Sequence, residues 1–311
     1  MKPSHNSARI GMIGAMSVFG SIGLFVRMIP LPSAEIALYR AILALLLLET
    51  VLIYRRMHPQ SNRTTGEALP YRRRLGHPLL WLSGAAIGFN WILLFEAYRY
   101  TTVSTATLAY YFSPVLVTVL SPILFHEQIG VCRIACFLLS TAGVVLMTGA
   151  VSVSADDLCG IALGLGAACL YAAVVLINKG MSNRVPGDPV ADDPISRTVV
   201  QFLAAAIVLL PYVLLTSGIQ ITVLDSIGWA ALLCIGFLHT GATYAVYFAS
   251  LRGISGQEAA LLSYIDPLIA VILSVFILGE DISAMQGVGG VLILGASVIN
   301  TCASASSDSN G

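Results

Sequence analysis

The chain has 311 residues, of which 57% are hydrophobic and 10% are charged, and its formal net charge is zero. Its mean hydropathy is +0.86, whereas an average soluble domain has about 25% charged residues. This composition excludes an ordinary soluble domain. We therefore expect an integral membrane protein without a nucleic-acid partner.

Apolar runs that could cross a bilayer can be counted along the chain, because a hydrocarbon core about 30 Å thick needs about 20 mostly apolar residues in a helix. Ten such runs follow one another, at Ile10–Val26, Ile36–Tyr54, Leu79–Phe95, Ser104–Phe125, Ile134–Val153, Leu158–Asn178, Thr198–Thr216, Ser226–Ala249, Gln257–Leu278 and Ile282–Cys302. We therefore predict an all-α membrane protein with ten transmembrane helices, five in each half of the chain.

Lysine and arginine are unequally divided between the two sides that these runs define. With the amino terminus placed inside, nearly all of them fall in cytoplasmic connections or at cytoplasmic helix ends, whereas Arg27 and Arg99 fall outside. An excess of these residues marks the cytoplasmic side, and the arginine-rich connection Arg55–His77 is interpreted as a topology anchor. We predict a protein of the cytoplasmic (inner) membrane with both termini in the cytoplasm.

Part of the first half of the chain recurs in the second half at an offset of 153 residues. Phe95, Arg99, Ala106, Leu108, Tyr111, Pro114, Leu120, Ser121 and Glu127 recur as Phe248, Arg252, Ala259, Leu261, Tyr264, Pro267, Leu273, Ser274 and Glu280. An odd number of spans per copy inverts the second copy in the bilayer, as in many secondary transporters. We predict two inverted five-helix repeats, residues 1–153 and 154–302, and a disordered cytoplasmic tail, residues 303–311.

Arg40 in the second run, the block from Ala106 through Pro114 to Glu127, and its echo in the ninth run carry a resemblance to a known family. On these residues and its ten runs, the chain resembles the EamA type of the drug/metabolite transporter superfamily over essentially its whole length. The resemblance implies a solute transporter, often an exporter of amino acids or related metabolites, with a central cavity lined by helices from both halves. It implies no particular substrate.

Asp266 lies near the middle of the ninth run, directly before Pro267. A lone carboxylate there costs at least about 2.5–3.5 kcal/mol, so neighbours must compensate for it or it must be protonated. The proline frees a backbone carbonyl one turn earlier, so the helix can open locally onto water. Asp266 is therefore a candidate for proton coupling. The structural alternative is that it caps a broken helix or pairs with a neighbouring hydroxyl. Its counterpart in the first repeat is Ser113.

Two further ionisable residues lie inside predicted spans. Arg40 could bind a substrate carboxylate through its planar fork, or it could extend to the outer interface beside Glu35. His239 lies in the middle of the eighth run. Because histidine titrates near neutrality, it suits a proton relay, and a hydrogen-bonded packing histidine is the alternative.

Aromatic and polar side chains gather on the third, fourth and ninth runs. Trp91, Tyr111 and Tyr264 lie deep enough to line a cavity, where they would suit a small amphipathic solute. Asn90 is placed for hydrogen bonding in the third run. Glu96 ends that run, and either a transport role or simple solvation fits its position.

Three classes of function are compatible with these features. The first is a secondary active transporter that exports small metabolites by alternating access, with protons as a candidate coupling ion. An importer or passive facilitator is the second. A membrane-embedded enzyme is the third, but the Gly-x-Ser-Gly motif at Gly253–Gly256 has no histidine downstream to activate its serine. We therefore expect no enzyme.

The expected partners are a small-molecule solute and membrane lipid, and a homodimer is left open. The six cysteines are scattered, and no histidine lies near the pair Cys132 and Cys136 to complete a metal site. We expect no metal, no cofactor and no disulfide.

Overall fold

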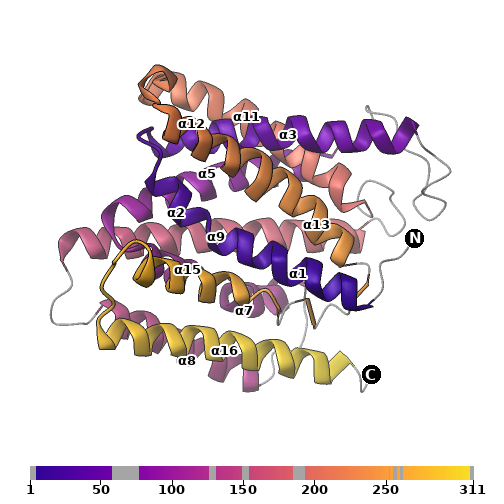
Figure 1. Cartoon of the computed structure of the whole chain (residues 1–311). Helices are drawn as coiled ribbons and strands as arrows, with labels where there is room; N and C mark the ends of the chain where they lie inside the picture. Colours follow the sequence, from indigo (N-terminus) through magenta and orange to yellow (C-terminus); the bar gives the residue numbers. More distant parts are fainter. Residues whose placement is uncertain are drawn as a thin grey trace. The chain divides into compact units, whose positions relative to one another are not determined.

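The structure is a computed structural model that describes residues 5–57, 77–125, 131–148, 154–184, 193–251, 253–254, 258–259 and 262–308 (Figure 1). Within these ranges the regular structure is entirely helical. The helices are α1 (His5–Gly20), α2 (Ile22–Arg27), α3 (Ser33–Met57), α5 (Pro78–Tyr100), α6 (Val103–Tyr110), α7 (Ser113–Phe125), α8 (Val131–Thr148), α9 (Ala155–Arg184), α11 (Pro194–Thr216), η2 (Ile221–Val223), α12 (Ser226–Leu233), η3 (Cys234–Ala242), α13 (Thr243–Ser250), α15 (Ile265–Phe276) and α16 (Ala284–Asp308).

Seven helical stretches of the described chain are long and apolar enough to cross a membrane. They are His5–Arg27, Ser33–Tyr54, Pro78–Tyr100, Val103–Phe125, Ala155–Met181, Pro194–Thr216 and Ser226–Ser250. Three shorter apolar helices, Ile134–Leu146, Ile265–Phe276 and Ala284–Ala296, lie in the predicted fifth, ninth and tenth runs. The all-helical prediction is confirmed for the described residues, while the count of ten spans and their inverted arrangement stay predictions.

The first span is interrupted at Ser21, between α1 and α2. The backbone N–H of Ser21 donates to the Val18 carbonyl at 3.1 Å, and its hydroxyl donates to the same oxygen at 2.8 Å. A Cβ added at Gly20 would collide with the backbone carbonyl of Asp266 in α15. Glycine therefore allows the first span to touch the α15 backbone where the span is interrupted.

The fourth and ninth runs are interrupted at positions that correspond in the 153-residue repeat. α6 ends at Tyr110 and α7 begins at Ser113, while α15 begins at Ile265 after a turn at Ser263 and Tyr264. In each case a proline follows in the first turn of the next helix, where its missing N–H leaves no intrahelical bond unmade. The helix is thus interrupted just before Asp266 and at the corresponding place in the fourth run, while an opening onto water stays a prediction.

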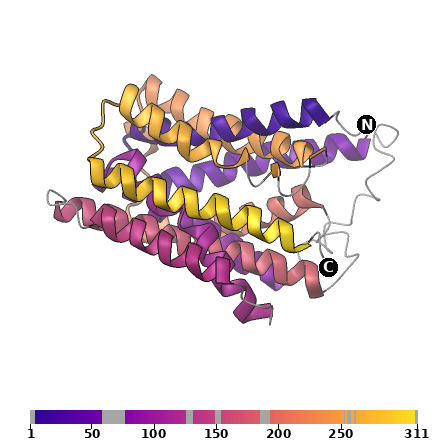
Figure 2. The ribbon, with the colours of Figure 1, turned by 90° about the horizontal axis from the view of Figure 1, so that it is seen from below.

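The chain divides into two compact units, unit 1 with residues 1–15, 28–92 and 173–254, and unit 2 with residues 16–27, 93–172 and 255–311. In unit 1, α3 packs against α11 and η3. In unit 2, α15 packs against α6 and α2, and α16 runs beside α8, as Figure 2 shows.

Glycines let helices approach closely within each unit. In unit 1, a Cβ at Gly84 of α5 would lie 2.6 Å from the Cβ of Ala204 in α11 and would also meet the Gln201 carbonyl. In unit 2, a Cβ at Gly164 of α9 would lie 3.1 Å from the Cβ of Ala109 in α6. Small residues at helix contacts are typical of membrane proteins, where close backbone packing drives association.

The Gly84 contact predicts a stability difference between two glycine-to-alanine variants. Gly84→Ala should destabilise the protein by about 1–3 kcal/mol, because the methyl group forces α5 and α11 apart. Gly295→Ala in α16 is the matched control, since a Cβ there meets nothing within 4 Å and alanine favours the helix. Unfolding in detergent measured by circular dichroism compares them, and equal stability of the two variants would contradict the packing.

Candidate functional site

Arg40 is buried in the interior of unit 1, with 5% of its surface exposed. Its Nε–H donates to the Thr240 hydroxyl at 2.7 Å, and its guanidinium carbon lies 4.2 Å from the centre of the Trp91 ring. A guanidinium stacked on an aromatic face gains a cation–π attraction that is strongest when both groups are desolvated. Thr240 and Trp91 therefore hold the Arg40 side chain inside unit 1, and its role stays a prediction.

The partner Thr240 lies in η3, a π-helix that interrupts the eighth span over Cys234–Ala242. The Thr240 hydroxyl donates to the Ile235 carbonyl at 2.8 Å, five residues earlier. Cβ atoms at Gly236 and Gly241 would collide with Leu43 and Leu47 of α3, so α3 lies directly on the π-helix. π-Helices are rare and often occur at functional sites, and this one carries the residue that holds Arg40.

His239 lies in the same π-helix with 1% of its surface exposed. Its Nδ1 is 3.3 Å from the Cys234 carbonyl and 3.7 Å from the Cys234 thiol. It is also close enough to Arg40 for the two side chains to interact electrostatically. His239 and Arg40 therefore belong to one polar cluster within unit 1. Nowhere in the described part of the chain do three His, Cys, Asp or Glu side chains gather to hold a metal ion.

A row of aromatic rings continues from Trp91 across unit 1. The Trp91 ring lies 5.3 Å from Phe202 of α11, Phe202 lies 5.6 Å from Tyr244 of α13, and Tyr244 lies 5.7 Å from Phe248. Asn90, the residue before Trp91, is 2% exposed. The cation of Arg40 therefore lies at one end of an aromatic row, an arrangement that suits a solute with a charged end and an apolar body.

A separate amide network lies in the same unit. The Gln201 amide donates to the Ser83 hydroxyl at 2.8 Å and to the Asn178 carbonyl oxygen at 3.0 Å. These bonds connect α11 to α5 and α9. Gln201 directly precedes Phe202, a member of the aromatic row.

Asp266, Tyr111 and Tyr264 come together in unit 2. The Tyr111 hydroxyl donates to the Ser263 carbonyl at 3.2 Å, and the rings of Tyr111 and Tyr264 are 6.3 Å apart. Asp266 lies in the first turn of α15 and is an electrostatic neighbour of Tyr111. A carboxylate in the first turn of a helix is stabilised by the helix dipole. The interruptions of the fourth and ninth runs thus meet beside one carboxylate.

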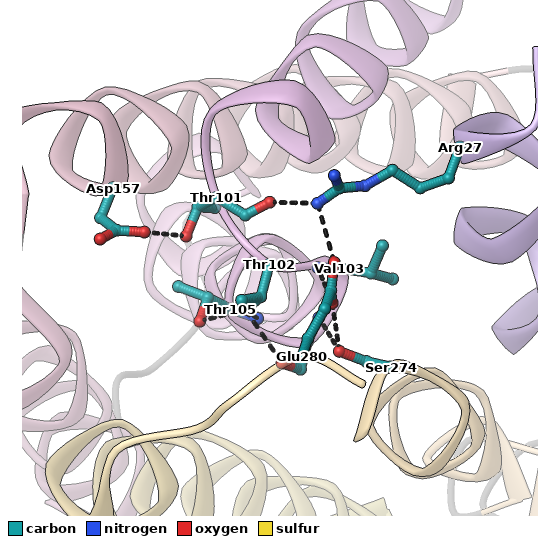
Figure 3. A network of polar contacts seen from close by, with 9 residues as sticks. Arg27, Thr101, Thr102, Val103, Thr105, Asp157, Ser274 and Glu280 are labelled. Carbon is teal, nitrogen blue, oxygen red and sulfur yellow. Dashed lines mark hydrogen bonds and ion pairs between the residues drawn. The ribbon is translucent and has the colours of Figure 1, made fainter. Parts of the chain in front are cut away.

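Glu280 is the centre of a third polar cluster, at one end of unit 2 (Figure 3). Its carboxylate accepts from the backbone N–H of Val103 at 2.7 Å, from the Ser274 hydroxyl, and from Arg27 at 2.8 Å. Arg27 also donates to the Thr101 carbonyl at 2.8 Å. Glu280 therefore caps the start of α6, a helix far from it in the sequence.

The same cluster extends to α9. The Thr101 hydroxyl donates to the Asp157 carboxylate at 2.7 Å (Figure 3). Two more first-turn N–H groups of α6 have partners, because Ser104 donates to the Ser274 hydroxyl at 3.4 Å and Thr105 donates to the Thr102 hydroxyl at 3.1 Å. We refer to Arg27, Thr101, Val103, Asp157, Ser274 and Glu280 as the polar clasp.

The predicted site residues thus fall into two groups and one outlier. Arg40, Trp91 and His239 cluster in unit 1, with Asn90 adjacent in sequence, and Tyr111, Tyr264 and Asp266 cluster in unit 2. Glu96 joins neither cluster, since it is partly exposed near the end of α5 with Arg99 at 3.9 Å.

Several residues at these sites escaped the sequence analysis. Thr240, Phe202 and Gln201 are buried in unit 1 and were not singled out. Thr240 had a signal, because it directly follows His239 in an apolar run, whereas the other two had none.

Comparison with known proteins gives concordant results. The sequence model of the EamA-like transporter family matches residues 6–149 and again residues 158–302. The uncharacterized transporter YxxF of Bacillus subtilis is 27% identical over 291 residues, which cover 93% of this chain and 87% of that protein. An uncharacterized transporter of Archaeoglobus fulgidus is 26% identical over 230 residues, which cover 73% of this chain and 78% of that protein.

A similarity to a solved crystal structure extends over nearly the whole chain. The TM-score is 0.64 at 17% sequence identity, and the match covers 96% of this chain and 98% of the other. It shows a shared fold.

The bond from Arg40 predicts unequal effects of removing two hydroxyls from the eighth span. Thr240→Val should destabilise the protein by about 1–3 kcal/mol, because it leaves a buried charged donor without this acceptor. Thr243→Val is the matched control, since the Thr243 hydroxyl makes the same kind of bond, to the Leu238 carbonyl at 2.7 Å. Unfolding in detergent compares the two, and an equal loss would show that the bond to Arg40 contributes nothing.

Proposed function

We propose that this chain, which belongs to the EamA-like transporter family, is a secondary active transporter of the inner membrane that exports small metabolites, such as amino acids or related compounds, by alternating access. The observation that supports it most is the buried Arg40 on the Trp91 ring. An arginine inside a membrane span costs at least about 2.5–3.5 kcal/mol and in general marks a functional site. The chain keeps this cation in an apolar helix because it recognises the solute.

Arg40 would bind the carboxylate of the solute. A guanidinium fork matches a carboxylate bidentately, and Thr240 and Trp91 already fix the orientation of this one. Because the cation does not have to be ordered on binding, less of the binding free energy is lost. The rings of Trp91, Phe202 and Tyr244 would contact the apolar part of the solute.

Asp266 would couple transport to protons. It lies beside Tyr111, where a span is interrupted. The corresponding residue of the first repeat is Ser113. The family model matches residues 6–149 and again residues 158–302, which supports two sequence repeats. With five spans each, the copies would be inverted and both termini cytoplasmic, which is the arrangement that alternating access uses.

Metabolites in the growth medium test the exporter proposal. Cells that overproduce the wild type should enrich at least one carboxylate-bearing compound outside. Arg40→Gln at the same membrane level should lower that enrichment at least about tenfold, because one charge-assisted bidentate contact is lost. Arg40→Lys should lower it less, since it keeps the charge without the fork.

Arg99→Gln is the control in that experiment, because it removes a cation whose side chain is 56% exposed. Depletion of a compound from the medium would indicate an importer instead. If no compound in the medium depends on Arg40, solute recognition by this residue is contradicted.

Proteoliposomes loaded with the solute test the coupling proposal. Asp266→Asn should abolish accumulation driven by a pH gradient, because an amide cannot carry the proton, and should leave solute exchange intact. Ser113→Ala, at the corresponding position of the first repeat, should accumulate solute like the wild type. Coupling through Asp266 is wrong if the Asn variant concentrates the solute as well as the wild type does.

A further inference from the structure

We infer that the polar clasp is a gate, closed in this structure, that opens and closes one end of unit 2. Only one part of this inference rests on the proposed function, namely that the opening of the gate admits the solute. Four of its members lie at the ends of separate helices: Arg27 ends α2, Val103 begins α6, Asp157 lies in the first turn of α9 and Ser274 in the last turn of α15 (Figure 3). Thr101 and Glu280 lie in the connections before α6 and after α15. When the clasp is formed, these four ends are held together.

The closed state depends on one carboxylate. The Glu280 carboxylate accepts hydrogen bonds from Arg27, from the Ser274 hydroxyl and from the Val103 N–H. Because the last of these is the first N–H of α6, the negative charge also lies at the positive end of that helix dipole. Loss of Glu280 would therefore remove the polar links of α2, of the α6 N-terminus and of Ser274 in α15 together.

The ion pair of the clasp is a bond that water can replace. Arg27 has a side-chain exposure of 36% and Glu280 of 12%, so solvent reaches the ion pair. Polar contacts of this kind exchange for contacts with water at little net cost. Interlocked apolar packing cannot be exchanged in this way, since its separation exposes apolar surface. The ion pair between Arg27 and Glu280 is therefore suited to repeated opening.

The segment that carries Glu280 can move without disturbing a packed core. Gly279 directly before it has a φ of +67°, and a Cβ there would meet nothing within 4 Å. Phe276 and Ile277, which precede it, are 82% and 59% exposed. Glycine in the left-handed region is a permissive pivot, so Glu280 lies on a surface turn and reaches inward to its partners.

The start of α6 also packs tightly against α2. A Cβ at Gly23 of α2 would collide with a methyl group of Val103 and would lie 3.4 Å from the Val103 Cβ. Disulfides form when two Cβ atoms are about 3.5–4.5 Å apart. The variant Gly23→Cys with Val103→Cys can therefore lock α2 to the start of α6 in a protein whose six native cysteines have been replaced by alanine.

The lock gives the functional test in the full-length chain. In the oxidised double variant, export of the compound found for the wild type should fall at least about tenfold, and a reductant should restore it in the same sample, which excludes misfolding. Val103→Cys alone, treated with the same oxidant, is the control. Export by the oxidised variant at the rate of the reduced one would overturn the gate.

Hydrogen–deuterium exchange in lipid nanodiscs tests the clasp without any solute, so it separates a failed gate from a failed transport proposal. The amides of residues 103–105 should exchange about tenfold faster in Glu280→Gln, because charge-assisted bonds are lost. They should exchange more slowly in the oxidised double variant. Arg99→Gln removes a cation at the C-terminal end of α5, shortly before these residues, and should leave their exchange unchanged. The gate is overturned if neither Glu280→Gln nor the disulfide alters exchange at these amides.

Discussion

Every backbone N–H and C=O inside a hydrocarbon core needs a partner from within the protein, because no water is available there. An interrupted helix in an apolar span is therefore possible only where the chain supplies such partners. The Ser21 hydroxyl and the Ser263 carbonyl take part in bonds of this kind at two interruptions. One polar cluster of unit 2 lies at such places, since Asp266 and the tyrosines beside it lie at the interruptions of the fourth and ninth runs.

Unit 1 meets the same constraint differently. Its eighth span stays helical but widens into a π-helix, and hydroxyls of that segment bond carbonyls five residues earlier. The widening brings Thr240 to Arg40, whose charge is further balanced by the face of the Trp91 ring. A cation that would be costly in lipid is thereby held in a defined position. Unit 1 thus holds a buried cation, while unit 2 holds a carboxylate at a helix start.

Much of this arrangement follows from local sequence, and some of it does not. Length and hydropathy predict the long spans, and Pro267 predicts the interruption beside Asp266. The π-helix has no such signal, because it depends on Leu43 and Leu47 of α3 fitting against Gly236 and Gly241. Val103, which donates to Glu280, is 177 positions away in sequence, so no local pattern predicts this contact. Arg40 was recognisable as an embedded cation, but its burial on Trp91 required the tertiary structure.

In unit 2 we expect the interruption beside Asp266 to open onto water, whereas the apolar cluster next to it excludes water. Reaction of single cysteines with a membrane-impermeant thiol reagent tests it most directly, in reconstituted protein without native cysteines. Ser263→Cys lies at the interruption of the ninth run, and Ile293→Cys lies in the adjacent apolar cluster, where the isoleucine is 0% exposed. The account predicts that the first is modified and the second is not. A Ser263→Cys variant as inert as Ile293→Cys would contradict it.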